Sequence, residues 1–252
     1  MKKMSNSGID YLDKAGNSMY GCKHGCPYCF GEQMVGPRLR GKVVSKNFKW
    51  DQPEYCPERI DMLKSQYPSA VSKNPNLPKG EVMVGVNFIA DMFGEWVPKE
   101  YIESVLKAIP EYNQYLFLTK NPARYGQFAD LLRKKNIWLG TTVEDETHLD
   151  RLIQLRNVKW TYFGHSYDID IGTKFWVSVE PLLGPLNCNI TNGDIDWVVM
   201  GACTGKMASQ PEYAWMEKIR NDCLYKDIPL FIKDNVKAEW TKQPRFKEFP
   251  KW

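Results

Sequence analysis

The chain alternates short apolar runs with longer amphipathic segments, and this alternation constrains the fold more than any other feature. The apolar runs have the character of buried strands, and the segments between them have helical periodicity, several with proline in the first turn. The predicted strands are 82–88, 115–119, 137–143, 175–179, 197–201 and 229–232, with a short first strand just before Cys22. The predicted helices are 57–66, 98–109, 122–135, 145–155 and 211–224.

Strands that alternate with helices imply right-handed βαβ units and a parallel sheet. We therefore expect an α/β fold, a partial (β/α) barrel of about six parallel strands with flanking helices. A chain of 252 residues suits one domain, with a core over about 18–235 and a C-terminal extension over 236–252. Barrel enzymes carry their chemistry at the carboxyl ends of the strands. Two stretches outside the alternation, the basic 36–50 and the aromatic 159–172, are expected to cap that site.

Three cysteines lie close together near the start of the chain, with the spacing Cys22-x3-Cys26-x2-Cys29. Three thiolates on one loop without a fourth ligand nearby suit a four-iron cluster that keeps one iron open. The alternatives are a structural zinc site and unrelated buried thiols. A structural zinc site requires four ligands, and His24 is the only extra candidate in this loop. The remaining isolated cysteines are expected to be buried thiols, with a second cluster as the alternative: Cys56, Cys188 and Cys223.

The cysteine spacing, with Tyr28 just before the last cysteine, resembles that of the radical S-adenosylmethionine (SAM) superfamily. The resemblance implies a [4Fe-4S] cluster on Cys22, Cys26 and Cys29 whose open iron binds SAM and cleaves it to a 5′-deoxyadenosyl radical. It also implies that Tyr28 lies near the SAM adenine. An electron donor such as flavodoxin or ferredoxin would serve the cluster.

Further segments, between about Tyr20 and Asp234, resemble a phage-associated radical SAM family: Leu118-Thr119-Lys120, Trp138-Leu139-Gly140, the run 178–185, the run 196–201 and Phe231-Ile232-Lys233. The chain departs from that family at two places. Gly201-Ala202-Cys203-Thr204-Gly205 replaces the family's Gly-Gly-Glu-Ser-Gly, and Lys233-Asp234 replaces a lysine-glutamine pair. Cys203 is a candidate hydrogen-atom donor to a product radical, or a small buried thiol.

Polar residues gather at the predicted carboxyl ends of the strands. Helix capping explains any one of them, but Glu180 lies in an apolar run before Pro181, where an unpaired carboxylate is costly. We expect substrate contact or proton transfer from Glu180, Lys120 and Lys233. From their positions at strand ends, the candidates for contact with the ribose and methionine groups of SAM are Asn87, Asp91, Thr119, Thr141 and Ser178.

Some relatives in the phage family are associated with thymidine hypermodification, which implies radical isomerisation of an amino-acid-modified thymidine in DNA. Two groups of basic and aromatic residues suit phosphate contact and base stacking, or form solvated faces. They are Arg38, Arg40, Lys42, Lys46, Lys49 and Trp50 near the cysteines, and Lys242, Arg245, Phe246, Lys247 and Trp252 at the C-terminus. The net charge of only +4 is modest for a DNA-binding domain.

A base in a duplex must flip out to meet a radical. The aromatic segment either lines a pocket for such a base or is a packed loop; its side chains are Trp160, Tyr162, Phe163, His165 and Tyr167. Radical SAM modification of RNA, a peptide or a small metabolite is an alternative function. A non-catalytic iron-sulfur or zinc nucleic-acid-binding module is another.

The chain has no predicted membrane segment. The N-terminal lysines precede no apolar stretch, and no run of about 20 apolar residues follows. Seven cysteines, an odd number, fit a reducing compartment better than a disulfide framework. We therefore expect a cytoplasmic enzyme, in the host cytoplasm if the gene is carried by a phage.

Overall fold

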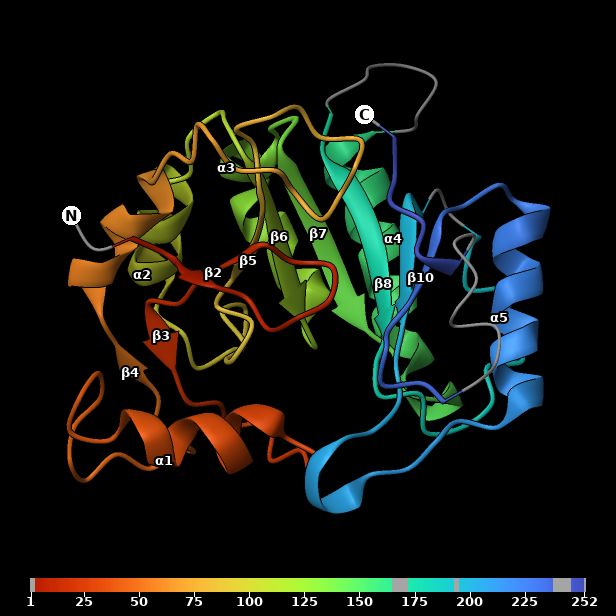
Figure 1. Ribbon diagram of the computed structural model, residues 1–252, viewed down its shortest axis with the longest axis horizontal. Coiled ribbons are helices and arrows are strands. Elements are labelled where there is room, and N and C mark those ends of the chain that lie inside the picture. Colours follow the sequence, from red (N-terminus) through yellow and green to blue (C-terminus); the bar gives the residue numbers. More distant parts are fainter. Residues whose placement is uncertain (1–2, 165–171, 193–194, 238–245, 252) are drawn as a thin grey trace.

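A computed structural model describes residues 3–164, 172–192, 195–237 and 246–251. The chain forms a mixed α/β fold around an eight-stranded sheet of order β1-β2-β5-β6-β7-β8-β9-β10 (Figure 1). β1 is antiparallel to β2, and every other neighbouring pair is parallel. The strands are β1 Ser5–Asn6, β2 Lys14–Gly16, β5 Met83–Val86, β6 Gln114–Thr119, β7 Ile137–Thr142, β8 Lys174–Val179, β9 Trp197–Met200 and β10 Leu230–Ile232.

The helices pack against one face of this sheet. The main α-helices are α2 Lys99–Lys107, α3 Ala129–Leu132, α4 Leu149–Val158 and α5 Tyr213–Tyr225. Their apolar residues join alternate strand residues in the larger core, for example Ile102 and Ile219 with Val177. The remaining helical segments are η1 Gly31–Val35, α1 Gly36–Leu39, η2 Pro57–Lys64, η3 Pro122–Phe128, η4 Glu146–His148, η5 Lys159–Phe163 and η6 Gly205–Met207.

The opposite face of the sheet curls around aromatic side chains. Trp138, Trp176 and Trp197 are fully buried there. The ring of Tyr11, which precedes β2, lies 5.4 Å from Trp197 and 5.8 Å from Phe231 of β10, centroid to centroid. Among the described residues no hydrogen-bonded ladder joins β1 or β2 to β10. The sheet is therefore curled and open, and its two ends meet through ring packing and a hydrogen bond from the Asp234 N–H to Asp10 Oδ2 at 2.7 Å.

Most of the described end of the chain, 246–251, packs against this second core, whereas Phe246 belongs to the larger core. The backbone N–H of Glu248 donates to Leu230 O at 3.1 Å, and the indole N–H of Trp197 donates to Glu248 O at 3.0 Å. The ring of Phe249 lies 5.1 Å from that of Phe231. This part of the predicted C-terminal extension therefore packs as core against β9 and β10.

The sequence predicted the α/β class, the parallel sheet and the strands β5 to β10, and these are confirmed. The sheet has eight strands rather than about six. The strand expected just before Cys22 is β3 (Met19–Tyr20), which pairs with β4 (Glu54–Tyr55) in a separate antiparallel sheet. The parallel part of the main sheet begins with β2, which pairs with β5. Just beyond these two strands, the Asn87 side chain accepts the N–H groups of Ser18 and Met19.

Three predicted helices differ in type, wholly or in part. The 57–66 segment is the 3-10 helix η2, the 122–135 segment begins as the 3-10 helix η3 and ends in the short α3, and the 145–155 segment begins as the 3-10 helix η4 and continues as α4. Gly126 lies inside the second segment, where the ring of Tyr162 occupies the space of a side chain. Glycine in a helix interior weakens α-helix formation.

None of the helices among the described residues combines the length and the apolar character needed to cross a bilayer.

The aromatic interior generates a stability prediction. A Cβ atom at Gly140 of β7 would overlap the indole of Trp176, which is fully buried. We expect Gly140→Ala to lower the free energy of unfolding by about 1–3 kcal/mol through overpacking. Gly8→Ala is the control, because a Cβ atom at Gly8 meets nothing within 4 Å. Urea denaturation measures both variants, and equal stability of the two would contradict the packing described.

Candidate functional site

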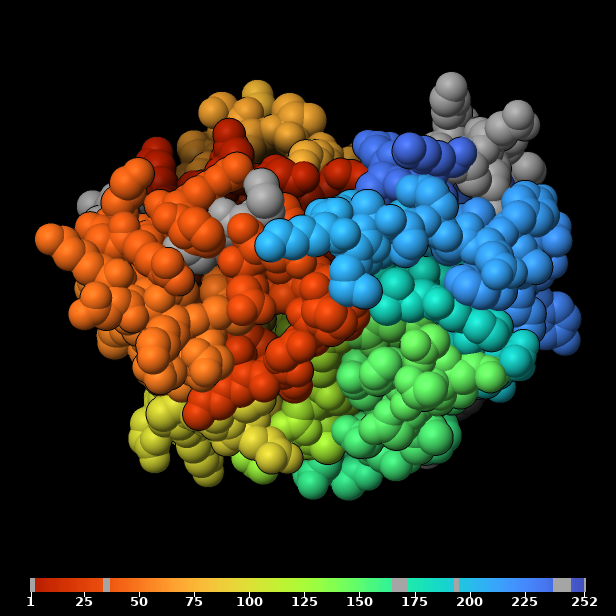
Figure 2. Space-filling model, turned by 90° about the horizontal axis from the view of Figure 1, so that it is seen from below, coloured from red at the N-terminus to blue at the C-terminus, as the bar shows by residue number. Residues whose placement is uncertain are grey.

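The cysteine loop, residues 21–30, lies at the edge of the sheet where the parallel strands end. Gly21 forms an isolated parallel bridge with Ala90, which follows β5. In Figure 1 the chain passes from β3 to α1 along the lower edge, toward which the strand arrows point. Figure 2 views this edge, where the segment around residue 205 (light blue) lies across the N-terminal part of the chain (red). The cysteine loop and the segment around residue 205 therefore belong to one edge of the sheet.

The three cysteine thiols are half-buried on this loop. Burial raises the pKa of Cys22 to about 12 and also raises the pKa of Cys29, and the neighbouring Cys26 contributes to both shifts. The thiols are therefore close enough to influence one another. The N–H of Glu32 lies 3.3 Å from Cys29 Sγ, a contact of the kind that stabilises a metal-bound thiolate.

The donor set fits an iron-sulfur cluster. Within the described parts of the chain, no three or more His, Cys, Asp or Glu side chains are already gathered around a metal-sized position. Three cysteine thiols on one partly exposed loop are nevertheless the donor type and number that a four-iron cluster with one open iron requires. Cys22 and Cys29 rest on an apolar layer that includes Phe48 and Trp50.

Asp91 holds the first half of the loop to the sheet. Its Oδ2 lies 2.7 Å from His24 Nε2 and accepts the N–H of Lys120 at 2.9 Å. Its Oδ1 accepts the N–H of Phe93 at 3.0 Å and the hydroxyl of Thr119 at 2.7 Å. Asp91 is 5% exposed. Four protein groups thus contact the carboxylate of Asp91, which the sequence predicted to contact SAM.

Other predicted SAM contacts are also buried. Asn87 has a φ of 55°, and its Oδ1 accepts the N–H groups of Ser18 and Met19 at 2.8 and 3.1 Å. The hydroxyl of Thr141 donates to Thr119 O at 2.8 Å. The five predicted contacts lie together at the carboxyl ends of β5 to β8, each of them buried: Asn87, Asp91, Thr119, Thr141 and Ser178. Their contacts with SAM stay a prediction.

Glu144 holds the second half of the loop. It follows β7 and is fully buried. Its Oε1 accepts hydrogen bonds from the Tyr28 hydroxyl and the Lys120 ammonium, and its Oε2 accepts one from Arg151 Nη1 at 2.7 Å. His148 Nδ1 lies 3.5 Å from Oε2. Glu144 is therefore the centre of a buried charged cluster that touches the cysteine loop through Tyr28.

Burial shapes the electrostatics of this Glu144 cluster. It lowers the pKa of Lys120 to about 8, lowers the pKa of Arg151 and raises the pKa of Tyr28. Lys120 Nζ lies 2.8 Å from the Tyr28 hydroxyl and 5.4 Å from the centre of its ring. The sequence pattern places Glu144 at a strand end without indicating its role. Its sequence context is that of Glu180, a carboxylate that follows a buried strand and therefore needs partners.

Glu180 and Lys233, predicted separately as site residues, form an ion pair. The Lys233 ammonium donates to Glu180 Oε1, and the side chains of Lys233 and Glu180 are 14% and 23% exposed. Glu180 follows β8, Lys233 follows β10, and Gly201 at the end of β9 lies between them. A Cβ atom at Gly201 would approach Glu180 Cγ and Lys233 Cδ to 3.0 and 3.1 Å, so glycine leaves room for the pair.

Cys203 lies just beyond this ion pair. It is 4% exposed, and burial raises the pKa of its thiol. Its backbone exchanges two 3.2 Å hydrogen bonds with Ser209, which closes the loop 203–209. That loop meets the segment following the cysteine loop where the N–H of Lys206 lies 3.3 Å from Gln33 Oε1.

The basic segment near the cysteines is only partly as expected. Its cationic residues are exposed: Arg38, Arg40, Lys42, Lys46 and Lys49. Trp50 is 9% exposed, and its ring packs 6.0 Å from Phe48 and against Gly31. Trp50 is therefore a core residue rather than a stacking platform for a base.

The aromatic segment lies away from the cysteine loop. Its described part, 159–164, precedes β8 and therefore lies at the end where the strands begin. Phe163 packs 5.3 Å from Phe175, whereas Trp160 and Tyr162 are 45% and 41% exposed. This placement does not support the expected cap or base pocket. His165 and Tyr167 lie outside the described residues.

The C-terminal basic group is largely outside the described residues as well, namely Lys242, Arg245 and Trp252. Phe246 is 2% exposed, and Lys247 Nζ donates to Ile232 O and lies 2.6 Å from Asp234 Oδ1. These two residues support the core and β10 rather than a free binding face.

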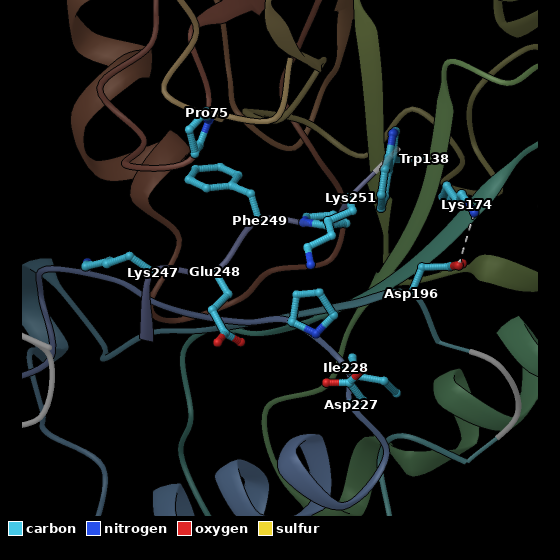
Figure 3. Close-up of a pocket in the computed structure, with 12 residues that line it drawn as sticks. Pro75, Trp138, Lys174, Asp196, Asp227, Ile228, Lys247, Glu248, Phe249 and Lys251 are labelled. Carbon is cyan, nitrogen blue, oxygen red and sulfur yellow. Dashed lines mark ion pairs between the residues drawn. The ribbon is translucent and has the colours of Figure 1, made fainter. Parts of the chain in front are cut away.

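A cavity of about 470 Å³ lies at the opposite edge of the sheet (Figure 3). Its lining comes from the starts of β7 to β10 and the C-terminal segment, including Trp138, Asp196 and Phe249. Lys174 and Asp196 are paired there at 3.6 Å. None of the residues predicted for the cluster, SAM or catalysis lines this cavity. We therefore place the candidate site at the cysteine edge, where the buried charged groups converge.

The Glu180–Lys233 pair generates a stability prediction. Lys233→Met leaves the partly buried carboxylate without its cation, and we expect the free energy of unfolding to fall by about 1–3 kcal/mol. The double variant Glu180→Gln/Lys233→Met removes both charges and should recover most of this stability. Urea denaturation at neutral pH measures the three proteins. A single variant as stable as the wild type would contradict the pairing.

Comparison with known proteins identifies a family. No curated protein and no solved structure matches the chain significantly. The family model described as "Protein of unknown function (DUF5131)" matches residues 6–249. Because this match covers nearly the whole chain, the protein belongs to the DUF5131 family.

Proposed function

We propose that this protein is a radical SAM enzyme in which Cys22, Cys26 and Cys29 hold a [4Fe-4S] cluster that binds SAM. The observation that carries the proposal is the position of these thiols, on one partly exposed loop at the carboxyl edge of a parallel sheet. When bound and reduced, the cluster supplies one-electron cleavage of SAM to a 5′-deoxyadenosyl radical. An electron donor such as flavodoxin or ferredoxin is part of the proposal.

The residues of the chain have separate tasks in this proposal. Asp91 and Glu144 fix His24 and Tyr28 of the cysteine loop. Glu180 and Lys233 retain some exposure and are placed to orient a substrate or to hold and accept a proton. Cys203, kept as a neutral thiol by burial, remains the candidate hydrogen-atom donor.

For the substrate we propose an amino-acid-modified thymidine in DNA, which the enzyme would rearrange after the base leaves the helix stack. The support is the exposed basic segment that continues from the cysteine loop, with Arg38, Lys42 and Lys46 among its residues. Cations on such a surface bind phosphates. An RNA, peptide or metabolite substrate would use the same radical chemistry with a different surface.

Anaerobic reconstitution with iron and sulfide, followed by reduction in the presence of SAM, tests the cofactor. We expect about four irons per chain and the formation of 5′-deoxyadenosine detected by mass spectrometry. Cys26→Ala should abolish cleavage, and Cys223→Ala, a buried thiol of α5, should not. Zinc in place of iron, without cleavage, would contradict the proposal and favour a nucleic-acid-binding module with a structural metal.

A salt titration of binding to a single-stranded oligonucleotide tests the substrate class. In the triple variant Arg38→Gln/Lys42→Gln/Lys46→Gln, we expect weaker binding and a salt slope smaller by about 0.7 for every phosphate that the protein no longer neutralises. The matched control is Lys99→Gln/Lys107→Gln, which removes exposed lysines of α2. An unchanged slope in the triple variant would argue against a nucleic-acid substrate at this surface.

A further inference from the structure

We infer that Lys120 is a positioning residue that sets the shape of the cysteine loop, because it joins the two carboxylates that fasten this loop to the sheet. The inference rests on the proposed function in taking the cysteines as cluster ligands. It gives Lys120 a role different from the substrate contact or proton transfer that its strand-end position suggested.

The two attachment points of the loop alternate with its cysteines. His24 lies between Cys22 and Cys26 and is bound to Asp91, and Tyr28 lies between Cys26 and Cys29 and is bound to Glu144. Cys26 is therefore held from both sides. The relative positions of the three sulfur atoms depend on where these two attachments lie with respect to each other.

Lys120 connects the two attachments directly. It follows β6, and its backbone N–H donates to Asp91 Oδ2 at 2.9 Å. Its ammonium donates to Glu144 and lies 2.8 Å from the Tyr28 hydroxyl. One residue thus contacts both carboxylates and one of the loop residues. Its side chain is 15% exposed and that of Glu144 is fully buried, so these contacts are little weakened by water.

The charged groups around Glu144 allow this role to be tested without unfolding the protein. Glu144 has a second cationic partner in Arg151, at 2.7 Å. Replacing Lys120 by Met keeps a long side chain and leaves Arg151 to neutralise the carboxylate. The backbone bond to Asp91 also remains, because it does not involve the side chain. Lys120→Met therefore removes the contact between the Tyr28–Glu144 attachment and the end of β6, while the Glu144 carboxylate stays paired with Arg151.

A positioning role and a catalytic role predict different results. If Lys120 acted on the substrate, its removal would lower turnover and leave the cluster unchanged. If Lys120 positions the loop, its removal changes the iron-sulfur cluster itself, even when no substrate is present. The decisive measurements are the rate at which a chelator removes iron from the reconstituted protein and the electron paramagnetic resonance spectrum of the reduced cluster.

The experiment compares Lys120→Met, Tyr28→Phe and the double variant with the wild type. We expect each single variant to release iron about 10-fold faster, as is typical when a residue supporting a metal ligand is removed. The double variant should release iron no faster than either single one, because both substitutions break the same connection. Lys107→Met is the matched control, since it breaks an exposed lysine–glutamate pair on α2 at 3.0 Å.

Hydrogen exchange in the metal-free proteins tests the same inference without iron. Lys120→Met should increase amide exchange within residues 21–30, and Lys107→Met should not. Unchanged exchange there, or wild-type iron release and spectra in Lys120→Met, would overturn the inference. A wild-type protein that takes up no iron would instead refute the proposed function, and the exchange result would still decide whether Lys120 orders the loop.

Discussion

Burial of two carboxylates at the carboxyl edge of the sheet determines how the rest of the site is arranged. An unpaired buried carboxylate is costly, and each of these two is surrounded by donors from separate parts of the chain. Asp91 receives groups from the cysteine loop and from the end of β6. Glu144 receives groups from the same loop, the same strand end and α4. Satisfying the two charges therefore brings the cysteine loop onto the sheet.

The core of the fold was predictable because its strands are long enough to show a pattern. β6, β7 and β8 are apolar runs bounded by polar residues, and their predicted limits agree closely with the structure. β1 and β2 contain only two and three residues, too few for periodicity to reveal. The local pattern before Cys22 correctly indicated extended backbone, but it carried no information about the partner strand, which is β4 in a separate sheet.

The sequence indicated candidate site residues where a residue type is unusual in its setting: three closely spaced cysteines on one loop, and the carboxylate of Glu180 in an apolar run. The contacts between these site residues could not be predicted from the sequence. The partners of Glu144 are far apart in sequence, with Tyr28 and Lys120 meeting Arg151 only in the folded chain. The sequence also did not reveal which aromatic side chains are buried and where they lie. Trp50 stands among exposed cations but turns into the core, and the aromatic segment before β8 lies at the amino edge because connections from helix to strand return there.

The absence of a hydrogen-bonded ladder between β2 and β10 among the described residues has a mechanical consequence. In a closed barrel the number of strands and the stagger of their hydrogen bonds fix the circumference. Here the two ends of the sheet meet through the rings of Tyr11 and Phe231 and through a hydrogen bond from the Asp234 N–H to Asp10 Oδ2 at 2.7 Å. In the described parts of the chain no strand ladder fixes the distance between β2 and β10, so the close-packed side chains between them, three tryptophans included, help to set it. The aromatic interior therefore acts as a spacer between the two ends of the sheet.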